Sequence, residues 1–435
     1  MVTARPPPPM RGYPMVCGHG CTHPGRCLPT GRRAVHRGRA GVARHRRRWP
    51  HRRAGPRGPA ARRTGRAHRR ATQHRGTGLH QRHTHLADGF AKELGFGQPY
   101  WEVFMPPDGL RHRALAATTE SALEEQLGRT LDHAIACGTA AFADFREGGA
   151  AGAELLRRAA GGRAIRPIVL GRMPAYPLQD DRELAANLAR LDDAQLGVLE
   201  GVIAAGDGFS LVSANDLTDP ALRQVGRVVR DRGKLLALHV SESPPYAELS
   251  RARTGRGDVQ RVIEHLRPDV AVHLTAADPA EFAALAGAGI AAACCPRNHA
   301  VIGLGIPRFD LMLAAGMRVA LGTDNALLCS PDLLAELQFA SRVIRAVRGD
   351  ASFPTAVQML QLITVHPARM FHLDGDLGWL APGKRADLVV FDRATDNLHP
   401  VTDPVAALVN RAVAADIAAV LHGGDVVHGR LPGLG

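Results

Sequence analysis

The first 80 residues contain no Asp, Glu, Lys, Ser, Asn, Ile or Phe, although they hold 20 Arg residues. A segment with so few apolar residues cannot build strands, yet it also lacks the Ser, Glu and Lys that are typical of disordered chains. We expect residues 1–78 to form a disordered tail rich in Arg and Pro. The formal charge of +14 comes from this tail, because the rest of the chain has 55 − 20 = 35 basic residues against 41 acidic ones.

Long apolar runs are also missing. No run approaches the roughly 18 residues needed to span a bilayer, and the N-terminus has no uninterrupted apolar stretch of the kind found in secretory signals. Seven Cys in 435 residues are too few for a disulfide framework. These absences predict a cytoplasmic protein with reduced thiols and no membrane partner, for which a homo-oligomer is one possible state.

Between residues 135 and 335, short β-rich runs alternate with segments of helical periodicity. The runs are Ala140–Phe145, Ala164–Leu170, Gly208–Ala214, Leu235–Val240, Val270–Thr275, Gly289–Cys295 and Arg318–Thr323. This alternation is typical of parallel strands with helical crossovers. If the segment ending at His85 is the first strand, the total is eight, which predicts an α/β fold with a TIM-type (β/α)8 barrel over residues 79–370.

The periodicity changes after residue 370. A strand-like segment at Ala386–Phe391 is followed by further β-rich pieces at Ala414–His422 and Asp425–His428. Residues 371–435 are therefore predicted to be the C-terminal part of a small β domain beside the barrel. Because the tail supplies no strands, we expect this domain to be an incomplete β-sandwich.

Five side chains stand where a metal site of a barrel enzyme is expected. His83 and His85 are two residues apart in a strand, so both can point toward one ion. In a chain with 21 His, such a pair is more often an ordinary surface or core pair. However, His239, His273 and Asp324 each end an apolar run, and barrel active sites lie at the carboxyl ends of the strands.

This set of residues predicts hydrolytic chemistry. Imidazoles and a carboxylate can hold one divalent metal, which would lower the pKa of a water from about 15.7 toward roughly 7. Asp324 would hold that water and take its proton, and His273 would bond the attacking oxygen. Glu242, three residues after His239, would protonate the substrate and then the leaving group, unless it is an ordinary loop carboxylate.

These motifs together resemble the amidohydrolase superfamily, and within it the branch of cytosine, guanine and S-adenosylhomocysteine deaminases and triazine hydrolases. The resemblance covers residues 83–435. It rests on His83-Thr84-His85, His239-Val240-Ser241-Glu242, Val272-His273-Leu274, Cys295-Pro296-Arg297, Gly322-Thr323-Asp324 and Gly378–Val390. The resemblance implies zinc or iron bound by His83, His85, His239 and Asp324, with Glu242 and His273 handling protons.

The chain departs from relatives of this branch at two places. Relatives with two metals carry a bridging Lys after the fourth strand, whereas this chain has none there, which favours a single metal, most simply zinc. The common Cys-Pro-x-Ser-Asn is Cys295-Pro296-Arg297-Asn298-His299 here, so the substrate contacts of this loop are open. Candidates for substrate binding, each of which can equally be a solvated loop residue, are Arg111, His112, Glu147, Arg172, Asn215 and Asn298.

The resemblance predicts an enzyme that hydrolyses C–N bonds other than peptide bonds in a small molecule, by deamination of an aminated nitrogen heterocycle. Hydrolysis of a cyclic amide and displacement of chloride stay open within the same superfamily. Outside enzymes, the alternatives are an inactive product of a damaged gene and an Arg-rich nucleic-acid binder. The tail has no interleaved aromatics and no RGG-type repeat, so its binding of nucleic acid is expected to be incidental.

The tail also suggests a frameshift. In the family, about the first fifty to sixty residues supply strands of the small domain, and an apolar residue followed by Asn-Ala precedes His-x-His. Leu79-His80-Gln81-Arg82 can be encoded so that the adjacent frame reads Ser-Ile-Asn-Ala. We therefore predict out-of-frame translation of residues 1–78, with a frameshift between about Leu79 and His83.

Overall fold

The computed structural model describes residues 73–105, 108–175 and 178–431. Residues 1–72 of the predicted tail, including three of the seven Cys, lie outside these ranges. Cys137, Cys294, Cys295 and Cys329 are all buried free thiols, as predicted. Among the helices of the described ranges, none has the length and apolar character needed to cross a membrane.

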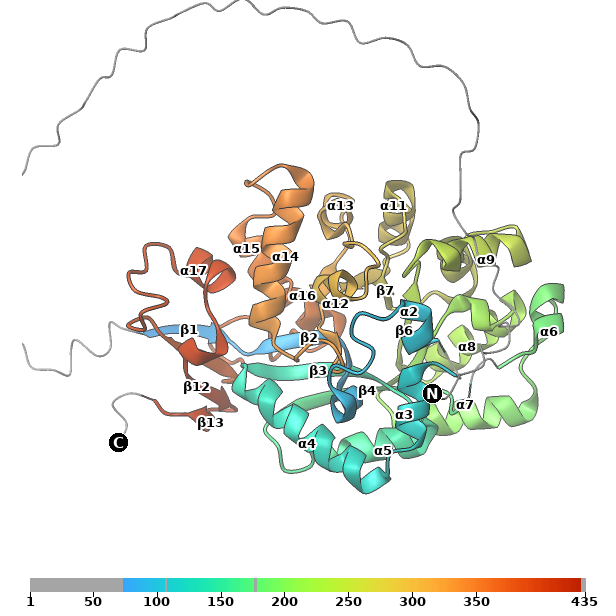
Figure 1. Ribbon diagram of the computed structural model, residues 1–435, viewed down its shortest axis with the longest axis horizontal. Helices are drawn as coiled ribbons and strands as arrows, with labels where there is room; N and C mark the ends of the chain where they lie inside the picture. Colours follow the sequence, from blue (N-terminus) through green and yellow to red (C-terminus); the bar gives the residue numbers. More distant parts are fainter. Residues whose placement is uncertain (1–72, 106–107, 176–177, 432–435) are drawn as a thin grey trace, which may run out of the picture. The chain divides into compact units, whose positions relative to one another are not determined.

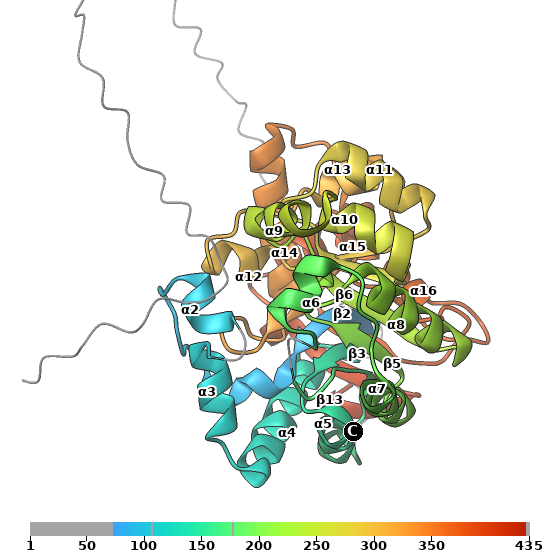
Figure 2. The same cartoon turned by 90° about the vertical axis from the view of Figure 1, so that its right-hand side faces the viewer.

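A curled parallel sheet forms the centre of the molecule (Figure 2). Its order in the described chain is β10-β2-β3-β4-β5-β6-β7-β8-β9. The bounds are β2 (Leu79–His85), β3 (Thr139–Arg146), β4 (Arg166–Gly171), β5 (Gly208–Leu211), β6 (Leu235–Val240), β7 (Val270–His273), β8 (Ala291–Cys294), β9 (Val319–Leu321) and β10 (Asp324–Asn325).

Strands β9 and β10 act together as the eighth barrel strand. Only Gly322 and Thr323 separate them, and β10 pairs with β2 through Asp324 opposite Thr84. Gly322 is required at this junction, because a Cβ there would lie 2.6 Å from the carbonyl oxygen of His83. The sheet therefore returns to its first strand, which confirms the predicted barrel and the place of His83 in it.

Helices surround this sheet in both views (Figures 1 and 2). Side-chain caps start several of them, and in α11 Asp278 accepts from the backbone N–H of Glu281 just before Pro279. The helices are α2 (Tyr100–Phe104), α3 (Leu110–Ala116), α4 (Glu120–Ala136), α5 (Gly149–Ala160), α6 (Asp181–Ala186), α7 (Asp193–Ala205), α8 (Asp219–Asp231), α9 (Pro244–Thr254), α10 (Asp258–Arg261), α11 (Pro279–Gly287), α12 (Pro296–Val301), α13 (Phe309–Ala314), α14 (Leu333–Arg348), α15 (Ala356–Gln361), α16 (Val365–Met370) and α17 (Pro404–Asn410), with short 3-10 turns at Leu86–Ala91, Ala214–Asp216 and Ala414–Asp416 and a π turn at Val262–Leu266.

One buried cluster combines small residues from the barrel strands with larger apolar ones. Alanines dominate it, and they include Ala141, Ala143 and Ala293, while Phe371 follows α16. Arg82, on β2, places its guanidinium carbon 4.3 Å from the centre of the Phe371 ring. The charged side chain of Arg82 thus packs against this apolar cluster through Phe371.

His80 and Arg82 are polar residues of β2 at buried positions that do not suit them. Both side chains are fully buried, and none of their side-chain nitrogens has a hydrogen-bond partner among the described residues. Burial lowers the pKa of Arg82 to about 9, against an opposing effect of Asp269, so the guanidinium stays charged at neutral pH. A buried and unpaired charge is one of the costliest features that a fold can contain.

A small antiparallel sheet lies to one side of the barrel, at the left of Figure 1. Its order is β1-β11-β12-β13, with β1 (Gln73–Thr77), β11 (Leu388–Asp392), β12 (Ile417–His422) and β13 (Asp425–Gly429). The C-terminal β region is therefore present as predicted, as one sheet in the described chain and not as a sandwich.

Strand β1 corrects the prediction that residues 1–78 supply no strand. Gln73 to Thr77 pair with Asp392 to Leu388 of β11, and Gly78 then donates a backbone hydrogen bond to Asp387 at 2.7 Å. This pairing is made by backbone groups at the edge of the sheet, so it does not need the apolar alternation that the sequence lacks.

Candidate active site

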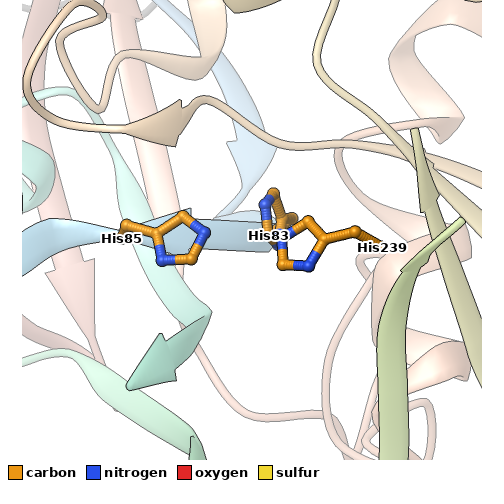
Figure 3. A group of neighbouring side chains, drawn as sticks. All are labelled: His83, His85 and His239. Carbon is orange, nitrogen blue, oxygen red and sulfur yellow. The ribbon is translucent and has the colours of Figure 1, made fainter. Parts of the chain in front are cut away.

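Three imidazoles meet at the carboxyl ends of two barrel strands (Figure 3). His83 and His85 project from β2 and His239 from β6, and one ring nitrogen of each lies within 4.8 Å of the others. All three side chains are buried. The structure thus brings together three of the residues that the sequence singled out as metal donors.

The inward direction of the β2 histidines follows from local packing. Between them, Thr84 points away from the barrel interior and donates a 2.9 Å hydrogen bond to the carbonyl of Ala143. Its hydroxyl also lies 3.1 Å from Asp144, which accepts a further bond from the backbone N–H of Leu86. Because side chains alternate along a strand, fixing Thr84 outward fixes both histidines inward.

Asp324 faces the histidines from the neighbouring strand. Its Oδ1 lies 3.2 Å from Nε2 of His83 and 3.7 Å from Nε2 of His85. Asp324 and His273 both have left-handed backbones, with φ of 61° and 75°. Such conformations are costly for residues other than glycine and gather at functional sites, where the surrounding structure holds them.

The donor set fits a divalent metal. Burial lowers the pKa of His83 to about 4, so its ring is neutral, and neither ring nitrogen makes a hydrogen bond within the described residues. In His85 and His239, Nδ1 lies 3.1 Å from the carbonyl oxygens of Phe145 and Val212, respectively. Donation through Nδ1 leaves Nε2 with a lone pair, which is the usual tautomer of a metal-binding histidine.

Glu242 lies beside this donor set. Its Oε2 accepts a 2.9 Å hydrogen bond from the hydroxyl of Tyr100, and its Oε1 is 3.8 Å from Nε2 of His273. Burial, with the nearby charge of Asp324, raises the pKa of Glu242 to about 8. The preceding Ser241 is anchored by two bonds to Asp258, at 2.6 and 2.7 Å, which fixes the loop.

Glu242, His273, Asp324 and two of the three donor histidines, His85 and His239, line one cavity of about 440 Å³, a volume that suits a small ligand. Five of the six predicted substrate-binding residues line it: Arg111, His112, Glu147, Arg172 and Asn298. Asn215 is the exception, because its amide donates to the carbonyl of Tyr246 at 2.9 Å and lies off the cavity wall. Its position after β5 placed it on the correct face but could not reveal that structural bond.

Glu147 is the carboxylate that two positively charged side chains of the cavity share. Arg111 Nη2 and Arg172 Nη1 donate to its Oε1 at 2.7 and 3.0 Å. Burial alone would raise the pKa of Glu147, but the two guanidinium groups and His85 hold it well below its ordinary value. Arg172 Nη2 also lies 3.3 Å from Nε2 of His239, so a cation stands next to the donor set.

The structure also brings in residues that the sequence did not single out. Asp88 accepts from Arg111 Nε at 2.7 Å, and Asn325 donates to Asn298, which in turn donates to Asp324. His299 contacts His273. Only His299 carried a signal, since it belongs to the segment Cys295–His299 that departs from the related pattern.

A (β/α)8 barrel with three imidazoles and a carboxylate at its carboxyl ends defines a metal-dependent hydrolase. The amidohydrolase family model matches residues 78–427. This chain therefore belongs to the amidohydrolase family, and it is an enzyme of that family in fold and in the composition of its site.

Several known proteins are similar over much of the barrel. A relative from Methanothermobacter thermautotrophicus, named "Putative aminohydrolase", is 29% identical over 349 residues, which cover 80% of this chain and 85% of that protein. A 5-methylthioadenosine/S-adenosylhomocysteine deaminase from Moorella thermoacetica is 31% identical over 221 residues, 50% of this chain and 51% of the relative. The solved structure of an adenosine deaminase from Xanthomonas campestris with bound zinc has a TM-score of 0.71 at 19% identity, over 82% of this chain and 80% of that one.

Proposed function

We propose that this protein hydrolytically deaminates an aminated nitrogen heterocycle with the help of one divalent metal, zinc by preference. The observation that carries the proposal is Glu242, a buried carboxyl with a raised pKa placed 3.8 Å from His273. Deamination needs a group that delivers protons to nitrogen at neutral pH, and such a carboxyl meets that need. The deaminases among the similar proteins support the same chemistry.

His83, His85, His239 and Asp324 would hold the metal. Borderline-soft zinc favours imidazole nitrogen together with carboxylate oxygen, and no Lys lies at the end of β5 that could bridge a second ion. When bound, the metal would supply a water whose pKa is lowered toward roughly 7. The remaining chemistry belongs to the side chains around it.

Asp324 accepts a proton from the attacking water, and the neighbouring imidazoles keep its pKa low enough for it to start as a carboxylate. Burial alone would raise that pKa, but His83 and its neighbours hold it well below the ordinary value. His273 donates from Nε2 to the oxygen as the new C–O bond forms. Glu242 gives its proton to a ring nitrogen of the substrate.

The C–N bond then breaks with the help of Glu242. Its carboxylate recovers a proton from the added oxygen and passes it to the amino group, which leaves as ammonia. The proton held by Asp324 restores Glu242, so the cycle balances as one water consumed and one ammonia released. Tyr100, which donates to Glu242 Oε2 at 2.9 Å, keeps the carboxyl in place.

Substrate binding is assigned to the cavity wall. Arg172 and Arg111 share Glu147, and Asn298 bonds Asp324, so these side chains connect the donor set to the space that a substrate occupies. His112 is anchored through Nε2, which lies 3.1 Å from the carbonyl of Phe104. These roles, the cytoplasmic location, a homo-oligomer and incidental binding of nucleic acid by the tail all stay predictions.

The pH profile should show the protonation of Glu242. Its folded pKa of about 8 lies above the ordinary value of 4.5, so the proton-donating form is present below pH 8 and is lost as the pH rises through 8. We expect kcat/KM to fall about tenfold per pH unit above that point. Initial rates from pH 6 to 10 measure this, and a flat profile up to pH 10 would remove Glu242 as the acid.

The function itself is tested by a release screen on the zinc-loaded protein. Aminated purines, pyrimidines and their nucleosides are assayed for ammonia, chlorotriazines for chloride, and cyclic amides for ring opening. The proposal expects ammonia from at least one heterocycle and neither of the other products at comparable rates. Chloride release or ring opening without ammonia would overturn it in favour of the corresponding family alternative.

A further inference from the structure

A short hydrogen-bonded chain of side chains runs from His273 through His299 to Thr275. His299 Nε2 lies 2.8 Å from His273 Nδ1, and His299 Nδ1 lies 2.9 Å from the hydroxyl oxygen of Thr275. His299 is fully buried on α12, and His273 is 1% exposed. The two imidazoles therefore share one hydrogen between these nitrogens, and both rings are shielded from water.

Such a chain has only two possible directions. In the first, Thr275 donates to His299 Nδ1, His299 Nε2–H donates to His273 Nδ1, and His273 carries its hydrogen on Nε2. In the second, every bond is reversed, and His273 presents a lone pair at Nε2. The direction decides whether His273 is a donor or an acceptor toward the reacting groups.

Two observations favour the first direction. The hydroxyl of Thr275 carries a hydrogen and has no other hydrogen-bond partner among the described residues. His273 forms a close group with Asp324, whose carboxylate accepts a hydrogen. Because Nδ1 of His273 faces His299, Nε2 is the ring nitrogen left to donate. Burial lowers the pKa of His299 to about 4, so His299 is neutral and carries a single proton, which limits the chain to the two directions above.

The backbone around this chain holds its members in place. His299 N–H donates to the carbonyl of Cys295 at 3.1 Å in the first turn of α12, and the carbonyl of His299 accepts from Leu304 at 3.0 Å. Cys294 Sγ lies 3.9 Å from the carbonyl of His273. His299 is thus held by its own helix while its ring is free to orient His273.

We propose that His299 is a positioning residue that, with Thr275, fixes the tautomer of His273 so that His273 Nε2 carries the hydrogen toward the reacting oxygen. This inference rests on the proposed function for its role in turnover, because a fixed donor at Nε2 stabilises negative charge on that oxygen. It also implies that His273 supplies no lone pair to a metal.

The tautomer can be measured without any substrate. Long-range ¹H–¹⁵N correlation spectra of the ¹⁵N-histidine-labelled protein distinguish Nε2–H from Nδ1–H rings, and the His273 signal is assigned by its loss in His273→Gln. We expect the Nε2–H form of His273 in the wild-type protein, with and without zinc. An Nδ1–H ring in the wild type would overturn the proposal, whatever the outcome of the release screen.

Variants of His299 test the role in turnover. His299→Leu removes the donor, and kcat should fall about 10–100-fold at nearly constant KM and zinc content, the scale seen for partners that orient site histidines. His299→Gln keeps a donor at the same reach and should recover most of the loss. Equal losses in Leu and Gln variants that both fold and bind zinc would overturn the positioning role.

Thr275 supplies the matched control at the other end of the chain. Thr275→Ser keeps the hydroxyl and should behave as the wild type, whereas Thr275→Val should weaken the tautomer preference and lower kcat about tenfold. Identical spectra and rates for the two variants would contradict the direction of the chain.

Discussion

Replacement of Glu242 by Gln is expected to lower kcat for ammonia release by about 10²–10⁴-fold, the range that positioned proton transfer contributes. Gln keeps the size of the side chain and can still accept from Tyr100, which donates to Glu242 at 2.9 Å. It cannot deliver a proton to a ring nitrogen or to the leaving amino group. The rate loss should therefore appear in kcat with a zinc content equal to that of the wild type.

The alkaline limb of the pH profile should also disappear in Glu242→Gln, because the titrating group is gone. Glu248→Gln is the matched control, since Glu248 is exposed on α9 near the same loop and should behave as the wild type. A Glu242→Gln enzyme that keeps more than a tenth of the wild-type kcat would rule out this carboxyl as the proton carrier.

Replacement of Arg82 by Met is expected to stabilise the protein by about 1–3 kcal/mol. Breaking a buried pair, which leaves one charge without compensation, costs about 3–5 kcal/mol, and Arg82 already lacks any hydrogen-bond partner in the described structure. Met keeps most of the methylene packing against Phe371 and removes the charge. The cation–π contact that would be lost contributes about 2 kcal/mol, since it is desolvated.

Chemical denaturation of both proteins, followed by fluorescence, measures the difference in the free energy of unfolding. Arg129→Met is the control, because the Arg129 side chain is 70% exposed and pairs with Glu125 one helical turn earlier. Its effect should stay within about 0.5 kcal/mol. Destabilisation by Arg82→Met would show that the guanidinium is compensated and would remove the physical argument that Arg82 does not suit its buried position.

The burial of two polar side chains without hydrogen-bond partners in the described structure bears on the origin of the N-terminal segment. His80 and Arg82 are fully buried, and they lie within the same four residues at which the composition of the chain changes. The family match begins at residue 78, next to this junction. The frameshift between about Leu79 and His83 stays a prediction, and sequencing the gene tests it: an upstream frame should encode apolar strands that end in Asn-Ala.

The metal donors and His273 could be predicted from sequence because one rule places most of them. Each barrel strand ends at the active face, so His239, His273 and Asp324 could be located from the apolar runs that precede them. His83 and His85 required only the alternation of a strand. The strand ends therefore determine most of the donor set without knowledge of any loop.

The rest of the site depends on side-chain directions that spacing does not determine. Tyr100 reaches Glu242 from a helix more than a hundred residues earlier, and Asn215 turns away from the cavity to bond Tyr246. Strand β1 was missed because its pairing uses backbone groups and leaves no apolar pattern to detect. These features arise from tertiary packing, which local sequence constrains weakly.

The central claim is that one metal, held by His83, His85, His239 and Asp324, supports ammonia release. The most direct test measures bound zinc per chain and the initial rate of ammonia release in the same preparations, from metal-free protein to saturation. The rate should rise linearly with zinc and level off at about one ion per chain, and His83→Asn should abolish both. Undiminished turnover in metal-free protein, or a rate that keeps rising to two ions per chain, would contradict the claim.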